Sequence, residues 1–258
     1  MIQQGYWNSD KYNTSIRYKE TCKECCENEN IFRTFRSNPN YNYIVGCDSH
    51  GYNTAKMFFE FIKKHYEELY INLDSFQKIE DVGGPPLYGF ENNRLKFSPN
   101  TLRYIKVLGD LNLHIGNLKN LDVVEIGPGY GGQSIVINNY NKVSSYTYID
   151  CVESINLIKK YVSFFEPFET IFYDTNSIEE KKWDLVIADS SLSEMDDEAF
   201  DFYLNKIIKN SKRAYMTMND DYRRNTTIQK IKSVFPNIKI FKDEPVLNPN
   251  NTCYILIE

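Results

Sequence analysis

The sequence has few of the features that mark membrane, secreted or nucleic-acid-binding proteins. Its 258 residues contain no apolar run near the ~18 residues that span a bilayer, and the start, MIQQGYWNSDKYN, has neither the basic nor the apolar region of a signal peptide. Its 30 Lys and Arg are outnumbered by 35 Asp and Glu, a balance that disfavours phosphate-backbone binding. We therefore expect a cytoplasmic protein without a membrane or nucleic-acid partner.

Cysteine is also scarce. Six scattered cysteines are too few for a small disulfide-stapled protein, and their one cluster is the Cys-x-x-Cys-Cys at 22–26. A zinc site there would need about two more ligands, and Cys47 and His50 are the candidate donors. However, the sequence has no second Cys-x-x-Cys pair, as a typical zinc site would. Reduced thiols without a metal are therefore the expected state.

The composition changes near residue 120. Before it, apolar spacing predicts amphipathic helices at 53–70 and 98–111, the second capped by Ser98. After it, short β-rich runs alternate with helical stretches, which favours a parallel sheet with helices on both faces. Strands are expected at 121–127, 144–150, 170–175, 183–189, 213–219, 237–241 and 252–258, with helices at about 131–140, 152–165, 194–210 and 222–234.

The last two expected strands break this alternation. Only the loop KDEPVLNPNN separates them, which is too short for a crossover helix, so they should pair antiparallel. The predicted fold class is therefore α/β: a Rossmann-like, seven-stranded, mostly parallel sheet with a C-terminal antiparallel hairpin, plus an N-terminal, mainly helical segment.

The most informative motif is EIGPGYGGQS, directly after an expected strand. Gly127, Gly129 and Gly132 fit the dinucleotide pattern G-x-G-x-x-G, whereas Glu125 to Gly131 also fit E-x-G-x-G-x-G, the adenosylmethionine pattern. Asp150 ends the next strand, where a carboxylate can bind a ribose diol in either case. The glycines alone leave both cofactors open.

Three features favour S-adenosylmethionine. Glu125 lies before the first glycine, where it can face the amino-acid end of that cofactor. Only one mononucleotide-type half is visible, so a second half for a nicotinamide is lacking. The C-terminal hairpin also suits a methyltransferase sheet better than a dehydrogenase sheet. S-Adenosyl-L-methionine is therefore the expected cofactor.

VVEIGPGYGGQS, YTYID and WDLVIADSSLSEM resemble class I S-adenosylmethionine-dependent methyltransferases. With SPNTLRYIKVLGDL and DVGGPPLYGF, the sequence more narrowly resembles the sugar O-methyltransferase family, over roughly residues 80–220. The resemblance implies a methyltransferase domain at 96–258 and a helical or loop segment at 1–95 that covers the substrate. It also implies the following cofactor contacts: Glu125, Gly127, Gly129 and Gly131 on the methionine side, Asp150 at the ribose, Asn176 at the adenine, and Arg103 and Tyr104 at the cofactor carboxylate or in the acceptor pocket.

A sugar hydroxyl has a pKa far above 7, so its methylation needs a general base or a metal. Glu194, which lies where the family has its active-site block, is the first candidate base, and Asp189 is the second. The alternative interpretation is structural, because SSLSEMDDEAF also fits the N-terminus of a helix. His50 is an alternative base, because imidazole titrates near neutrality. Asn219 and Asp220 follow the fifth strand, and Asp189, Glu194 and Asp220 could form a Mg²⁺ site.

We therefore expect an O-methyltransferase that transfers a methyl group in line to a small-molecule sugar, nucleotide-sugar or glycan hydroxyl. The alternatives are a methyltransferase of another small molecule, a nicotinamide-dependent oxidoreductase, and a non-catalytic cofactor-binding module. A homodimer is one expected assembly, because the N-terminal helices could cover a neighbour's site.

Overall fold

The computed structural model describes residues 9–218, 224–246 and 253–257. At its centre lies a seven-stranded sheet in the order β5–β4–β3–β6–β7–β9–β8, in which β9 runs antiparallel to both neighbours and the other pairs are parallel. The strands are β3 (Asp122–Ile126), β4 (Ser145–Asp150), β5 (Thr170–Asp174), β6 (Leu185–Asp189), β7 (Ala214–Met218), β8 (Lys239–Lys242) and β9 (Cys253–Ile257). The predicted fold class is confirmed.

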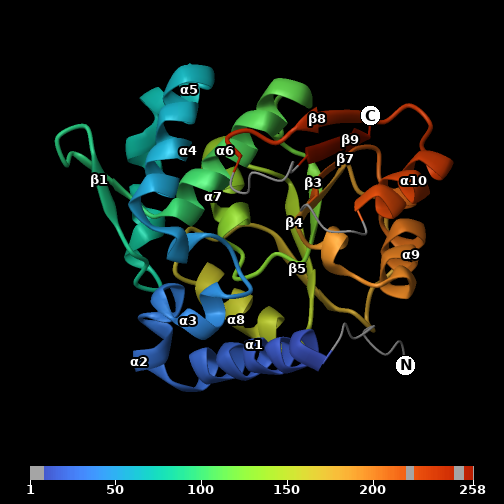
Figure 1. Ribbon diagram of the computed structural model, residues 1–258, viewed down its shortest axis with the longest axis horizontal. Coiled ribbons are helices and arrows are strands. Elements are labelled where there is room, and N and C mark those ends of the chain that lie inside the picture. Colours follow the sequence, from blue (N-terminus) through green and yellow to red (C-terminus); the bar gives the residue numbers. More distant parts are fainter. Residues whose placement is uncertain (1–8, 219–223, 247–252, 258) are drawn as a thin grey trace.

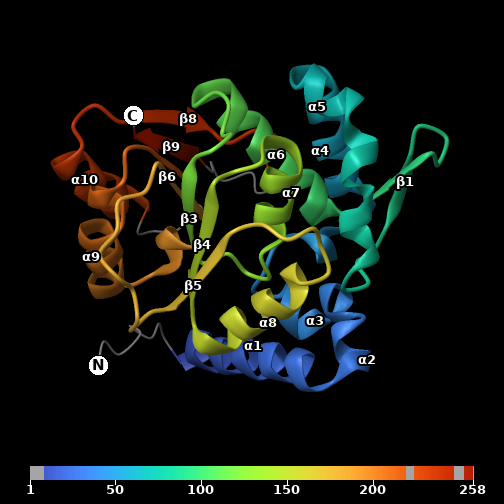
Figure 2. The same ribbon diagram turned by 180° about the vertical axis from the view of Figure 1, so that it is seen from behind.

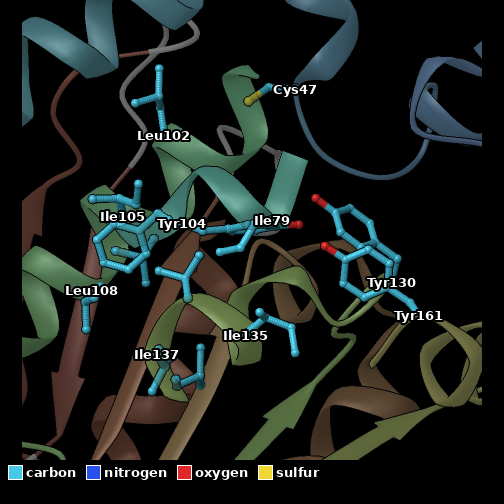
Figure 3. Packing of buried hydrophobic residues seen from close by; sticks show 14 of the residues in the cluster. Cys47, Ile79, Leu102, Tyr104, Ile105, Leu108, Tyr130, Ile135, Ile137 and Tyr161 are labelled. Carbon is cyan, nitrogen blue, oxygen red and sulfur yellow. The ribbon is translucent and has the colours of Figure 1, made fainter. Parts of the chain in front are cut away.

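Helices cover both faces of the sheet (Figures 1 and 2). On one face lie α6 (Pro99–His114), α7 (Gly132–Asn141) and α8 (Val152–Val162), and on the other α9 (Asp197–Lys206) and α10 (Arg224–Val234). Neighbouring strand residues such as Val123 and Val124 are fully buried in opposite core clusters, because successive side chains of a strand point to opposite faces. Figure 3 shows part of the first cluster, where Ile105 and Leu108 of α6 lie over α7.

The N-terminal segment packs on the α6–α8 side of the molecule. It comprises α1 (Ser9–Glu27), α2 (Glu29–Phe32), α3 (Pro39–Asn42), α4 (Gly51–His65), α5 (Glu67–Ile71) and the hairpin of β1 (Tyr88–Phe90) and β2 (Leu95–Phe97). In Figure 1, α1 runs beneath α8, and α4 lies beside α6. Because the segment's buried apolar residues share one core cluster with α6–α8, both parts form a continuous core. The domain boundary at residue 95 stays a prediction.

One predicted helix is broken in the structure. The helix expected at 53–70 is two helices, α4 and α5, separated at Tyr66, whose backbone leaves the helical region (φ −130°, ψ 66°). The Tyr66 ring packs against Gly109 of α6, where an added Cβ would lie 2.2 Å from it, and its hydroxyl donates to Asp110. The helix therefore breaks to satisfy contacts with α6. Similarly, the stretch at 194–210 contains only α9 and short 3₁₀ turns.

A buried arginine fixes the N-terminal segment to the start of α6. Arg36 is fully buried, and its Nη2 donates to the Ser98 Oγ (2.7 Å) and pairs with Glu80 (3.1 Å). Ser98 itself caps α6, as predicted, by accepting a hydrogen bond from the Thr101 amide. The orientation of α6, which carries Arg103, thus depends on the N-terminal segment. Within the described residues, none of the helices has both the length and the apolar character to cross a bilayer.

Candidate active site

A cavity of about 790 Å³ lies where β3, β4, β6 and β7 end at the carboxyl edge of the sheet. Polar residues at such an edge converge because parallel strands all end on the same side. The cavity brings together most of the predicted site residues: His50, Arg103, Tyr104, Glu125, Gly127, Gly129, Asp150, Asp189 and Glu194. Gly131 and Asn176 are not in its wall.

The glycine loop forms the floor of the cavity. Gly127 and Gly129 have φ values of 69° and 60°, in the left-handed region that favours glycine. A Cβ on Gly127 would lie 2.5 Å from the Cβ of Ser191, and one on Gly129 would lie 2.7 Å from Val45 of the N-terminal segment. Both positions therefore require glycine, because Ser191 and Val45 pack closely against this loop. Gly131 lies deeper, as the N-cap residue of α7.

Glu125 is a buried carboxylate in the wall of this cavity. It lies near the end of β3, is 2% exposed, and its Oε2 accepts a hydrogen bond from the Tyr146 hydroxyl at 2.7 Å. Burial raises the pKa of Glu125 to about 8, although the Tyr146 hydrogen bond acts in the opposite direction. None of the Lys and Arg side chains described forms a salt bridge with it. Glu125 is therefore suited to a ligand that brings a positive charge.

Asp150 ends β4, one strand away from Glu125. Its Oδ1 accepts a hydrogen bond from the Cys151 amide (2.7 Å), and burial raises its pKa to about 6. Beside it lies Tyr18 of α1, whose hydroxyl donates to the Ser154 Oγ at 3.1 Å. Sequence reasoning missed Tyr18, because nothing in the spacing of α1 relates it to β4.

The other half of the cavity is built around an ion pair. Asp189 ends β6, and its Oδ1 accepts from the Arg103 Nη2 at 2.5 Å and from the Thr217 Oγ1 at 2.6 Å. Arg103 also donates to the Ser190 Oγ (3.0 Å), and Ser190 has a φ of 63°, which is strained for a residue with a Cβ. Arg103, predicted to contact the cofactor or the acceptor, is thus held against the second candidate base.

Glu194, His50 and Asn176 lie on loops or 3₁₀ turns. Glu194 and His50 both line the cavity and are exposed, on the 3₁₀ turns Leu192–Glu194 and Asp48–His50. Asn176 is exposed in the loop after β5, outside the cavity wall, and its amide donates to Asp174. Asn219 and Asp220 lie outside the described residues.

Metal binding finds no support among the residues that the structure describes. These residues contain no group of three or more His, Cys, Asp or Glu side chains placed to hold a metal ion. The expected magnesium site included Asp220, which is not among them. None of the six cysteines, which all lie within the described residues, forms a disulfide, and Cys22 and Cys25 are buried on α1.

Sequence reasoning also missed Asp243, which lines the cavity directly after β8. The last two strands pair antiparallel, as predicted, and β9 lies between β7 and β8 and runs antiparallel to both. Hence β8 runs in the direction of β7 and ends at the active edge. The sequence feature that could have identified Asp243 is an acid at or directly after the end of a strand, as at Asp150 and Asp189.

No protein-family model and no curated protein matches this sequence. Among solved structures, the chain is similar to the methyltransferase domain of a bacterial Hen1 protein (10% identity, 60% of this chain and 96% of that chain, TM-score 0.48). It is also similar to magnesium protoporphyrin IX methyltransferase from Synechocystis PCC 6803 with bound SAM (15%, 77% and 95%, TM-score 0.49) and to a methyltransferase from Pyrococcus furiosus (10%, 59% and 81%, TM-score 0.45). At these values the likeness goes no further than the fold.

Proposed function

We propose that this protein is an S-adenosylmethionine-dependent O-methyltransferase whose acceptor is a sugar hydroxyl. The observation that carries the proposal is Glu125, a buried carboxylate that faces a glycine-lined cavity without a salt-bridge partner among the described residues. A ligand with a cationic amino-acid end would favour the ionised form of Glu125 and pair with it. The ribose of the same ligand would suit Asp150, which ends the neighbouring strand.

The same charges disfavour a dinucleotide. A dinucleotide places a pyrophosphate at the glycine loop and needs donors and positive charge there. In this cavity burial raises the pKa of Glu125 most, and repulsion from the nearby Asp189 and Asp150 raises it further. Arg103 is already paired with Asp189. A pyrophosphate at this loop would add negative charge to a wall that is already acidic.

Each half of the cavity would have its own task. Bound adenosylmethionine would supply an electrophilic methyl group on a sulfonium. Glu125, Asp150 and the glycine loop at Gly127 and Gly129, which all line the cavity, would hold the cofactor, so that its methyl group meets the acceptor in line.

The acceptor half would hold the sugar and take up its proton. Glu194 is the proposed general base, with His50 as the alternative, since both line the cavity. Asp189 fits that role less well, because its Oδ1 already accepts from Arg103 and Thr217. The hydroxyls of Ser190 and Thr217 and the carboxylates of this half match the hydrogen-bonding needs of a sugar. The choice of a sugar rests on the resemblance of residues 80–220 to the sugar O-methyltransferase family.

Calorimetric titration of the purified protein with S-adenosylhomocysteine, NAD⁺ and NADP⁺ tests the cofactor assignment. We expect micromolar binding of S-adenosylhomocysteine and no binding of the nicotinamide cofactors. Binding of NAD⁺ or NADP⁺ alone would make the protein an oxidoreductase, and binding of none would favour a non-catalytic module. A screen of nucleotide-sugars, methyl glycosides and oligosaccharides with labelled adenosylmethionine then tests the acceptor class.

A further inference from the structure

We propose that Asp243 faces the transferable methyl group and binds the acceptor hydroxyl. This inference rests on the proposed function and adds a residue that neither the glycine motif nor the acidic block after β6 indicates. Its basis is the position of Asp243 in the cavity wall, its buried cationic anchor and the contrast with its neighbour Glu244.

Asp243 reaches the cavity from a strand that is far from the glycine loop in the sheet order. It directly follows β8, whose carboxyl end lies on the same edge as the ends of β6 and β7. Its carboxylate is close enough to Asp189 and Arg103 for both charges to act on its pKa. Asp243 therefore belongs to the acceptor half of the cavity.

A buried lysine fixes the Asp243 side chain. The Lys106 Nζ donates to the Asp243 Oδ1 and pairs with Asp110 at 2.8 Å, and the Lys106 side chain is only 3% exposed. Asp110 also accepts from the Tyr215 hydroxyl on β7 at 2.6 Å. Asp243 is thus tied to both α6 and the sheet, which makes it a positioned group rather than a surface acid.

Arg103 and Lys106 are three residues apart on α6, so they lie on neighbouring turns of one helix face. Arg103 binds Asp189 at the end of β6, and Lys106 binds Asp243 at the end of β8. One helix therefore holds two carboxylates in place in the acceptor half of the cavity. Burial raises the pKa of Asp243, while Lys106 and then Arg103 act to lower it. The carboxylate can accept a hydrogen bond from a hydroxyl and attract a nearby cation.

The next residue is placed differently. Glu244 pairs with Lys242 at 3.1 Å, both side chains are more than half exposed, and Glu244 lines a separate outer groove with Lys64 and Phe61. Glu244 and Asp243 thus have the same charge and adjacent positions but face different spaces. Glu244→Gln is therefore a matched control for Asp243→Asn.

The test needs no known acceptor. Sinefungin is an adenosylmethionine analogue in which a carbon replaces the sulfur and an amine replaces the transferable methyl group, whereas S-adenosylhomocysteine has a neutral thioether and no group at the methyl position. If Asp243 faces that position, Asp243→Asn should lower the sinefungin affinity about tenfold relative to the S-adenosylhomocysteine affinity, the scale of a charge-assisted hydrogen bond. Glu244→Gln should leave the ratio of the two affinities unchanged, and Asp243→Glu should largely preserve it.

The outcomes separate the two proposals. An unchanged ratio in folded Asp243→Asn, with S-adenosylhomocysteine still bound, would overturn the role of Asp243 and leave the methyltransferase proposal intact. Failure of the wild type to bind S-adenosylhomocysteine would overturn both. Thermal melting checks that each variant is folded. Asp243→Ser provides a second neutral replacement if the Asn variant does not fold, with the same expected loss.

Discussion

The two halves of the cavity hold their carboxylates in opposite ways. In the cofactor half, burial raises the pKa of Glu125 to about 8 and that of Asp150 to about 6. In the acceptor half, Asp189 and Asp243 are each bound by a cation from α6. A cationic ligand in the first half would favour the ionised form of its carboxyl groups, whereas in the second half the protein itself supplies a cation to each carboxylate. Charge recognition is therefore expected mainly in the cofactor half, and proton transfer and positioning in the acceptor half.

The largest expected effect concerns turnover in the acceptor half. Glu194→Gln should lower turnover by about 10²–10⁴ if Glu194 is the base, because the amide cannot take up the hydroxyl proton. Affinity for S-adenosylhomocysteine should stay the same. Initial rates on an acceptor found in the sugar screen, together with calorimetry, measure both quantities.

Glu198→Gln is the matched control, since Glu198 is an exposed acid in the first turn of α9, outside the cavity wall. Near-normal turnover of Glu194→Gln would transfer the base role to His50 or Asp189. Loss of cofactor binding in this variant would instead mean that Glu194 also contributes to the cofactor half.

The next effect is on stability and involves both halves. Arg36 anchors Ser98 at the start of α6, and its guanidinium carbon lies 5.2 Å from the centre of the Tyr130 ring in the glycine loop. Arg36→Met would leave Asp48 and Glu80 buried without their cation, so the free energy of unfolding should fall by about 3–5 kcal/mol. Urea denaturation measures this loss.

Arg33→Met should change stability little, because the exposed Arg33 pairs only loosely with Glu29 (3.8 Å). If Arg36→Met were equally mild, the N-terminal segment would not be what holds the two halves together.

A smaller effect is expected in the cofactor half. Asp150→Ala should weaken S-adenosylhomocysteine binding by about 1.5–3 kcal/mol, the scale of hydrogen bonds to a charged group. Asp174→Ala is the control, because Asp174 ends the neighbouring strand β5 but is not in the cavity wall. Equal losses in both variants, or none in either, would contradict the placement of the ribose at Asp150.

The two halves also differ in how far the sequence predicted them. The glycine loop follows β3 and Asp150 ends the adjacent strand β4, so local backbone rules were enough to place both at one edge of the sheet. Arg103 and Asp189 lie 86 residues apart, and their pairing depends on how α6 crosses the sheet. Asp243 could be assigned to the active edge only once β9 was placed between β7 and β8. The break at Tyr66 likewise depends on Gly109, a contact between two helices that periodicity within one helix does not contain.

The last expected effect concerns the pH dependence of Glu125 in the protein without cofactor. The folded-state pKa of Glu125, about 8, lies above the ordinary value of 4.5, so the folded state holds a proton that the unfolded state releases. The stability from this group is therefore complete below pH 4.5 and is lost as the pH rises through 8, by about 1.4 kcal/mol for each pH unit between them. Glu125→Gln cannot titrate, so the difference in unfolding free energy between wild type and this variant should follow that slope. Urea denaturation at pH 5.5, 6.5 and 7.5 measures it, and a pH-independent difference would mean that Glu125 is already ionised and has a partner within the protein.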